Sequence, residues 1–301
     1  MDAALPASAR PAAEPKAVAG PEADWPAAVT VRRPERPAPV VFASPHSGRH
    51  YPPALLERSR LNAREIRLSE DALVDELIAP ALECGAALVL AGHARAWVDV
   101  NRAADELDAA MFDAPPEGPA VRTTRVAAGL GVIPRIVGAG REIYGGKLPA
   151  NEARSRIDRT WRPYHAALQA TLEETRRRFG RVVLVDWHSM PSAAAAAAPG
   201  RAPDMVLGDR FGASCSSALS ALVQRELEAT GYRVVRNAPY SGGWTTERYG
   251  DPDSGAHALQ VEISRRLYMD ETTLRRHDGF ERLQRDLTRV GAAVAALAAR
   301  L

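Results

Sequence analysis

The chain of 301 residues lacks most features of secreted, membrane-embedded or nucleic-acid-binding proteins. It has two cysteines, Cys84 and Cys215, and no CxxC motif, which argues against a disulfide framework or a cysteine-rich zinc knuckle and favours a reducing cytoplasm. No stretch reaches the roughly 18 consecutive apolar residues of a membrane-spanning helix. The 39 basic and 37 acidic residues are spread without a long basic block, so we expect neither a membrane nor a nucleic acid as partner.

The beginning of the chain differs in composition from the rest. Residues 1–38 are rich in alanine, proline and charge and contain no compact apolar segment typical of a secretion signal, so we predict a flexible tail. Residues 39–301 show no convincing boundary and are expected to form one domain. An apolar content of 46% is ample for its core.

Apolar runs alternate with amphipathic segments along this domain. Strands followed by helices are typical of an α/β protein, and we predict a single, mostly parallel or mixed sheet flanked by helices. Pro163 should kink the longest helix. Strands are expected at residues 40–44, 86–91, 96–100, 182–185, 205–207, 232–235 and 259–263, and helices at 69–84, 151–179, 216–230 and 271–301.

Two of the expected strands run directly into a histidine that is followed by a serine. The residues are His46 and His188, and in parallel sheets ligands gather beyond the carboxyl ends of strands. A single histidine in such a place is more often a hydrogen-bonded structural residue, but two in matching contexts favour a metal site. Catalytic zinc commonly takes three protein ligands from histidines and carboxylates. Neither serine sits in a GxSxG motif, which makes serine hydrolysis the weaker interpretation.

The third ligand is expected near the start of the helix that follows the first strand. Glu70, Asp71 and Asp75 are all available there, although acidic residues in a first helical turn also complement the helix dipole without any metal. Asp186 precedes His188 by two residues and therefore lies on the same face of its strand. Its carboxylate could accept the proton of the ring nitrogen that does not bind metal.

The last strand carries a candidate general base. Leu259, Val261 and Ile263 share one face, so Glu262 points away from the apolar layer and needs a metal, water or arginine as partner. A structural ion pair with an arginine is the alternative.

Two further segments are candidates for substrate binding. Asn101 and Arg102 close the expected strand at 96–100, and an arginine there could hold an acidic substrate through a bidentate fork or simply lie at the surface. The loop with Tyr240, Gly242 and Gly243 has no phosphate-binding spacing. Its adjacent glycines permit a close approach of backbone to a substrate, or only a tight turn.

Taken together, these segments resemble the N-formylglutamate amidohydrolase family over about residues 40–272. Each matching piece is weak alone, and the set is specific because the pieces occur in order. They are 44–48 (SPHSG), 70–71 (ED) with 74–77 (VDEL), 98–102 (VDVNR), 186–191 (DWHSMP), 206–212 (VLGDRFG), 237–243 (NAPYSGG) and 260–263 (QVEI).

The resemblance implies a phosphorylase/hydrolase-like α/β fold related to the zinc carboxypeptidase and aspartoacylase group. It implies hydrolysis of an N-acyl amino acid, typically N-formyl-L-glutamate to formate and glutamate, late in histidine degradation. The implied roles are zinc ligands at His46, Asp71 and His188, a general base at Glu262, and substrate carboxylate binding by Asn101 and Arg102. Arg95 or Arg102 would stabilise the oxyanion, and Tyr240, Gly242 and Gly243 would line the substrate site.

Two departures from the family and its wider group leave alternatives open. His46 lacks the carboxylate three residues later that carboxypeptidases use, so the third ligand must come from the later helix. The segment 71–73 differs from the version typical of histidine-pathway enzymes, so the substrate could be another N-acyl amino acid or a short peptide. A non-catalytic binding protein on the same fold is the remaining alternative. The sequence predicts no oligomeric state.

Overall fold

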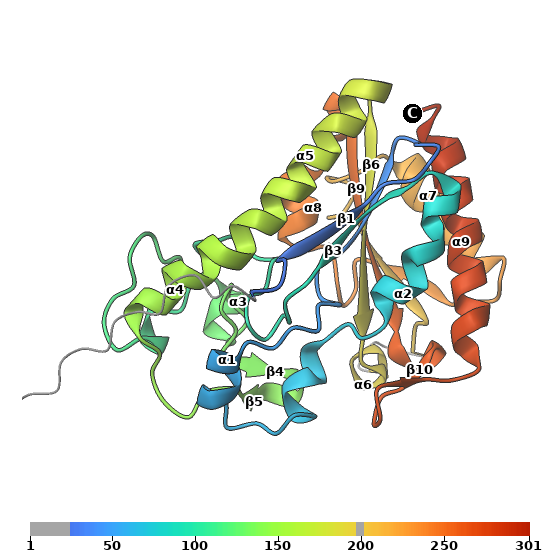
Figure 1. Cartoon of the computed structure of the whole chain (residues 1–301). Helices are drawn as coiled ribbons and strands as arrows, with labels where there is room; N and C mark the ends of the chain where they lie inside the picture. Colours follow the sequence, from blue (N-terminus) through green and yellow to red (C-terminus); the bar gives the residue numbers. More distant parts are fainter. Residues whose placement is uncertain (1–24, 197–201) are drawn as a thin grey trace, which may run out of the picture.

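A seven-stranded mixed sheet forms the centre of the protein (Figure 1). The computed structural model describes residues 25–196 and 202–301. Strands β2, β3, β6 and β9 are parallel, whereas β1 and β7 run antiparallel to their neighbours β3 and β9. In sheet order the strands are β1 (Val29–Arg32), β3 (Ala87–Ala91), β2 (Val40–Ser44), β6 (Val182–Met190), β9 (Ala256–Ser264), β7 (Met205–Gly208) and β8 (Val234–Arg236). The predicted α/β class with a mostly parallel or mixed sheet is confirmed.

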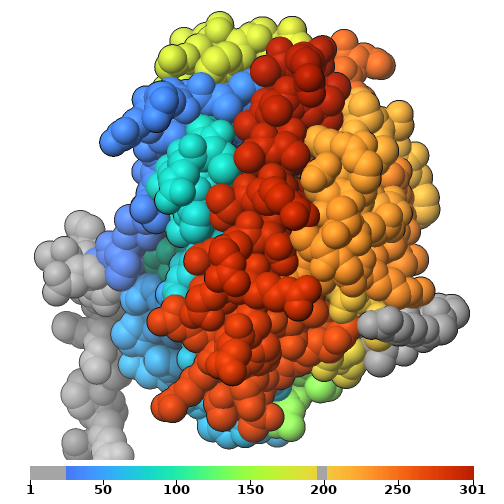
Figure 2. All heavy atoms as spheres, turned by 90° about the vertical axis from the view of Figure 1, so that its right-hand side faces the viewer, coloured from blue at the N-terminus to red at the C-terminus, as the bar shows by residue number. Residues whose placement is uncertain are grey.

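Helices cover both faces of this sheet. On one face lies α5 (Arg162–Phe179), which follows α4 (Ala150–Arg156). On the other lie α2 (Val74–Ile78), α7 (Ser217–Glu228) and α9 (Gly279–Ala298), and Figure 2 shows α9 between the α2 segment and α7. The shorter elements are α1 (Pro53–Arg58), α3 (Thr124–Ala127), β4 (Ile136–Val137), β5 (Arg141–Glu142), α6 (Ser192–Ala196), α8 (Trp244–Tyr249), β10 (Met269–Asp270) and β11 (Arg275–Arg276).

Successive residues of the central strands point to opposite faces of the sheet. This alternation creates two apolar cores and also positions the polar site. In β6, Val185 and Trp187 pack into the core beneath α9, while Leu184 packs into the core beneath α5. Successive strand residues point to opposite faces, so Asp186 and His188 continue the α5 side towards the carboxyl end of the strand. Polar residues of β9 reach the same side by the same rule, because β9 pairs in parallel with β6.

The prediction of a strand at residues 96–100 is wrong. The chain there makes a tight turn in which the amides of Trp97 and Val98 donate to the carbonyl of Ala94. The edge beside β3 is occupied instead by β1 (Val29–Arg32), so no place in the sheet is left for this segment. Its apolar residues are buried in the core beneath α5.

Strand β1 also shows that the predicted flexible tail, residues 1–38, extends too far along the chain. Residues 29–32 were expected to be part of a flexible segment that ends at residue 38, yet they pair with β3. The predicted boundary is therefore too late, because the alternating apolar side chains of this strand pack against the core beneath α5. Residues 1–24 of the predicted tail lie outside the described residues.

Three predicted helices are interrupted or shorter. The helix at 69–84 is divided into a 3-10 turn (Glu65–Ser69), α2 and a second 3-10 turn (Ala79–Cys84), because Leu73 has a left-handed φ of 67° and a proline stands at position 80. The helix expected at 151–179, with a kink at Pro163, is divided into α4 and α5 by a π-helical turn, Ile157–Trp161, and Pro163 lies in the first turn of α5. Residues 269–276 contain the antiparallel pair β10–β11, so the last helix begins at Gly279.

Within the described ranges, no helix combines the length and the apolar character needed to cross a membrane.

Candidate metal centre and active site

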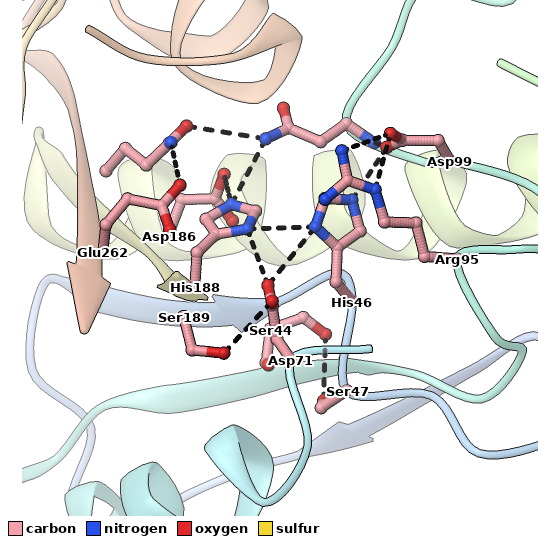
Figure 3. A network of polar contacts seen from close by, with 12 residues as sticks. Ser44, His46, Ser47, Asp71, Arg95, Asp99, Asp186, His188, Ser189 and Glu262 are labelled. Atoms are coloured by element: carbon pink, nitrogen blue, oxygen red, sulfur yellow. Dashed lines mark hydrogen bonds and ion pairs between the residues drawn. The ribbon is translucent and has the colours of Figure 1, made fainter. Parts of the chain in front are cut away.

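His46, Asp71 and His188 meet at the carboxyl edge of the sheet (Figure 3). His46 follows β2 by two residues, and His188 lies near the end of the neighbouring strand β6. Asp71 comes from the break between the Glu65–Ser69 turn and α2, where its backbone amide donates to the carbonyl of His46 at 2.9 Å. All three side chains are buried.

One atom of each residue belongs to a compact triangle. His188 Nδ1 lies 3.1 Å from His46 Nδ1 and 3.2 Å from Asp71 Oδ2, and His46 Nδ1 lies 3.4 Å from the same oxygen. Ligand atoms held about 2.0–2.2 Å from a tetrahedral zinc ion are about 3.3–3.6 Å apart. The triangle therefore has nearly the size of one face of such a coordination sphere.

The outer nitrogens of both histidines contact carboxylates. His46 Nε2 lies 2.7 Å from Asp99 Oδ1, and His188 Nε2 lies 3.0 Å from Asp186 Oδ2. Each carboxylate accepts the proton of the nitrogen it faces, which leaves an unprotonated lone pair on both Nδ1 atoms. Two lone pairs and a carboxylate oxygen that converge within about 3 Å repel one another unless a cation lies between them. The donor set thus fits a divalent metal ion.

Without a metal, the same groups compete for a proton. Burial favours a higher pKa for Asp71, but its contacts with His188 and His46 outweigh burial and hold the pKa well below its usual range. Burial likewise opposes the charged form of His188, yet Asp186 and Asp71 raise the pKa of this imidazole well above its ordinary value. A metal must therefore displace a tightly held proton when it binds.

Of the three carboxylates considered as third ligand, only Asp71 lies with the histidines. Its other oxygen, Oδ1, accepts hydrogen bonds from Ser189 Oγ and Arg265 Nη2, each at 3.2 Å, so Oδ2 is left facing the centre. Glu70 is held instead by Tyr51 at 2.7 Å and by two nitrogens of Arg67 at 2.8 Å. Asp75 pairs with Arg49 at 2.6 Å.

Glu262 stands beside His188 in the register of β6 and β9. It is buried, and Gln260 Nε2 donates to its Oε1 at 2.8 Å. Burial raises the pKa of Glu262, and the cationic form of His188 opposes that rise. No arginine of the described chain lies within ion-pair distance of Glu262, which argues against the alternative of a structural ion pair.

Two arginines have part of their guanidinium groups occupied by the protein. Arg95 Nε and Nη2 both contact Asp99 Oδ2 at 2.9 Å. Arg102 donates from Nε to the carbonyl of Leu130 at 2.9 Å and from Nη1 to the carbonyl of Asn101 at 2.7 Å. One terminal nitrogen of each arginine remains for a further partner.

Asn101 is used to fix the glycine-containing loop. Its Oδ1 accepts from the amide of Thr245 at 2.8 Å, and its Nδ2 lies 3.2 Å from His188 Nε2. A Cβ on Gly243 would stand 2.3 Å from Asn101 Nδ2, and Gly242 has a φ of +122°. The adjacent glycines are thus required for close packing of the loop against Asn101 and for its turn.

Two adjoining cavities open onto this centre, with volumes of about 380 and 280 Å³. His188, Glu262, Arg95, Arg102 and Tyr240 line both of them. The smaller cavity brings together all the predicted substrate-binding residues, which are Arg95, Asn101, Arg102, Tyr240, Gly242 and Gly243.

The sequence-based prediction missed several residues of the site. Asp99 contacts His46 across 53 residues of sequence, so the local spacing that marked Asp186 beside His188 could not mark it. Arg125 reaches the smaller cavity from the short helix α3, and Arg265 reaches the larger one from the turn after β9; no motif marks either residue.

Fold and site together define a mixed α/β protein with a candidate metal centre at the carboxyl edge of its sheet. Comparisons with known proteins agree with this class and narrow it. The model of the N-formylglutamate amidohydrolase family matches residues 38–269. The chain belongs to the N-formylglutamate amidohydrolase family, which confirms the resemblance inferred from the sequence.

Individual relatives support the same assignment. The chain is 32% identical over 237 residues to N-formylglutamate deformylase of Pseudomonas putida, which covers 78% of this chain and 83% of the relative. The enzyme of the same name from Pseudomonas aeruginosa is 33% identical over 236 residues, or 77% and 83% of the two chains. The crystal structure of N-formylglutamate amidohydrolase from Ralstonia eutropha JMP134 superposes with a TM-score of 0.87 at 38% identity, covering 91% of this chain and 99% of that one.

Proposed function

We propose that the protein hydrolyses the amide bond of N-formyl-L-glutamate to give formate and L-glutamate, and that it holds a zinc ion at His46, Asp71 and His188. The observation that carries the proposal is the triangle of three potential ligand atoms, which faces cavities lined by Glu262 and two arginines. The names of the relatives from the two Pseudomonas species support the substrate.

A zinc ion at this place would supply polarisation of the substrate carbonyl and a water molecule whose pKa is lowered towards roughly 7. The remaining chemistry belongs to the side chains. Glu262 faces the same cavities as His188 and takes the proton of the attacking water. It then delivers this proton to the departing amine, so it acts first as a base and then as an acid.

The arginines have two separate tasks in this proposal. Arg95 is held by Asp99, and its remaining terminal nitrogen donates to the oxyanion that develops on the formyl group. The remaining terminal nitrogen of Arg102 donates to a carboxylate of the glutamate. Asn101, Tyr240, Gly242 and Gly243 complete the substrate site as its wall.

The direct test combines a metal analysis with an assay on the purified full chain. We expect about one equivalent of zinc per chain and release of formate from N-formyl-L-glutamate. Glu262→Gln keeps the zinc and loses turnover, because the amide cannot take up the proton. Near-normal turnover in this variant would remove Glu262 from the mechanism, and a metal-free preparation with full activity would contradict the zinc proposal.

Two further parts of the proposal concern the cellular setting. We infer that the reaction takes place in the cytoplasm, which is supported by the free thiols of Cys84 and Cys215. We also infer a role late in histidine degradation, which is supported by the family to which the chain belongs.

A further inference from the structure

The two cavities at the metal centre differ in chemistry. We call the smaller one the basic compartment; it shares Arg95 and Arg102 with the other cavity, and the residues that line it alone include Asn101, Arg125, Ser241 and Gly242. We call the larger one the apolar compartment, and its walls are formed mainly by Leu68, Leu130, Pro134, Ile136, Val137 and Pro191. Because His188 and Glu262 line both, the reacting bond must lie where the two compartments meet.

The basic compartment contains one arginine without a carboxylate partner and another with an unused terminal nitrogen. Arg125 donates from Nη2 to the backbone carbonyl of Gly242 at 3.2 Å, and no carboxylate of the described residues lies within ion-pair distance of it. Arg102 contributes the terminal nitrogen that the backbone carbonyls leave unused. The two carboxylates of a glutamyl group therefore fit this compartment by charge.

The apolar compartment contains an arginine that is fully engaged. Arg265 donates from Nε to Ser189 at 3.1 Å, from Nη1 to the carbonyl of Leu68 at 3.0 Å and from Nη2 to Asp71 at 3.2 Å. Each of its three nitrogens therefore already has a partner in the protein, and Asp71 pairs with its charge. A glutamyl group would therefore find no cation there beyond Arg95 and Arg102, which line both compartments, whereas a hydrocarbon chain would gain contacts.

A close backbone contact joins two segments of the wall of the apolar compartment. Gly138 follows β4 and packs on the Leu68 segment, where a Cβ on this glycine would lie 3.1 Å from the carbonyl oxygen of Leu68. Pro191, directly after β6, also lines this compartment. The volume between these walls, about 380 Å³, is within the range of roughly 300–1,000 Å³ that small-molecule sites span.

A formyl group uses none of this space. The carbonyl carbon of the substrate carries the glutamyl nitrogen on one side and only a hydrogen on the other. If the glutamyl group occupies the basic compartment, that hydrogen points into the apolar one. We propose that the apolar compartment binds the acyl group, and that the protein hydrolyses N-acyl-L-glutamates with linear acyl chains of several carbons in addition to the formyl compound.

This inference rests on the proposed function and extends its substrate class. The chemistry is unchanged: water forms a new C–O bond at the acyl carbon, the C–N bond breaks, and the proton moves to the amine to give a fatty acid and glutamate. Each methylene that leaves water for the compartment should raise kcat/KM roughly fourfold until the cavity is full.

The test measures kcat/KM of the zinc-loaded full chain with N-acetyl-, N-butyryl- and N-hexanoyl-L-glutamate, and with the formyl compound as reference. The trend is read within the three alkanoyl compounds, since their carbonyl groups have similar intrinsic reactivity. We expect a rise from acetyl to hexanoyl. A flat or falling series alongside efficient deformylation would overturn this inference and leave the proposed function standing. Failure with every compound, the formyl one included, would count against both.

Substitutions in the wall of the apolar compartment test whether the acyl chain binds there. Leu68→Trp narrows the apolar compartment alone and should lower the ratio of hexanoyl to acetyl kcat/KM at least tenfold. Ala194→Phe, in α6, also narrows this compartment alone and serves the same purpose if the first variant does not fold. Leu56→Trp is the matched control, because Leu56 is exposed and lines neither compartment. An unchanged ratio in a folded narrowing variant would overturn the placement.

Discussion

The carboxylate of Asp99 joins His46 to Arg95. One oxygen lies 2.7 Å from His46 Nε2, and the other is 2.9 Å from two nitrogens of Arg95. A single buried aspartate thus sets the ring orientation of a potential metal ligand and the position of the proposed oxyanion donor. Arg95, His46 and Arg102 together hold the pKa of Asp99 well below its usual range against the opposing effect of burial.

Asp99→Asn should therefore weaken metal binding and turnover at once. The amide cannot accept the His46 proton as a carboxylate does, and we expect zinc affinity to fall about 10–100-fold. Competition with a chromophoric chelator measures the change. Asp158→Asn, on the surface of the helical segment before α5, is the control and should bind zinc normally. Unaltered zinc affinity in Asp99→Asn would show that His46 does not depend on this carboxylate.

Substitution of the acidic residues in turn identifies the third ligand. Asp71→Asn should lose most of the bound zinc, because its Oδ2 completes the triangle of potential ligand atoms. Asp75→Asn should keep its zinc, since Asp75 pairs with Arg49 in a surface ion pair. Metal content after dialysis against a low chelator concentration distinguishes the two variants. The reverse result would place the metal elsewhere.

Zinc affinity should rise with pH. The pKa of His188 is raised well above its ordinary value in the metal-free protein, so below that pKa a proton occupies the imidazole that the metal needs. Isothermal titration at pH 6, 7 and 8, in several buffers, should give tighter binding at higher pH and the release of protons on binding. Affinity independent of pH, without proton release, would mean that His188 is not a ligand.

The contact between Gly243 and Asn101 predicts an effect on substrate affinity. Gly243→Ala places a methyl group where the Asn101 amide now lies, so the loop and the wall of the basic compartment must move. We expect KM for N-formyl-L-glutamate to rise at least tenfold while zinc content stays unchanged. Gly146→Ala, at a position where an added Cβ meets no neighbour within 4 Å, is the matched control. Equal KM values would show that the loop does not shape the substrate site.

Strand periodicity predicted the part of the site that lies on the sheet. The ends of β2 and β6 place His46 and His188 side by side, and alternation places Asp186 and Glu262 on their face. The choice among Glu70, Asp71 and Asp75 could not be made in this way. It depends on a break in the chain at Leu73, whose left-handed conformation has no glycine or asparagine to mark it.

The strand at residues 96–100 was predicted incorrectly for a similar reason. Residues 96–100 have the composition of a strand, but whether an apolar segment pairs depends on which other segment already occupies the edge. Arg265 shows the same limit within the site, since its contacts to Ser189 and Asp71 join segments far apart in the sequence. Competition between segments for a place in the sheet, and contacts between residues far apart in the sequence, leave no local pattern in the chain.

Strand β1 has a practical consequence for any shortened form of the protein. It is antiparallel to β3 and leaves a four-residue strand as the outermost one. Removal of residues 1–38, at the boundary that composition alone favours, would expose the backbone donors and acceptors of β3 along an apolar strand. Such an unpaired edge recruits other chains, so the truncated protein should aggregate. A shortened chain that stays monodisperse should begin before Val29.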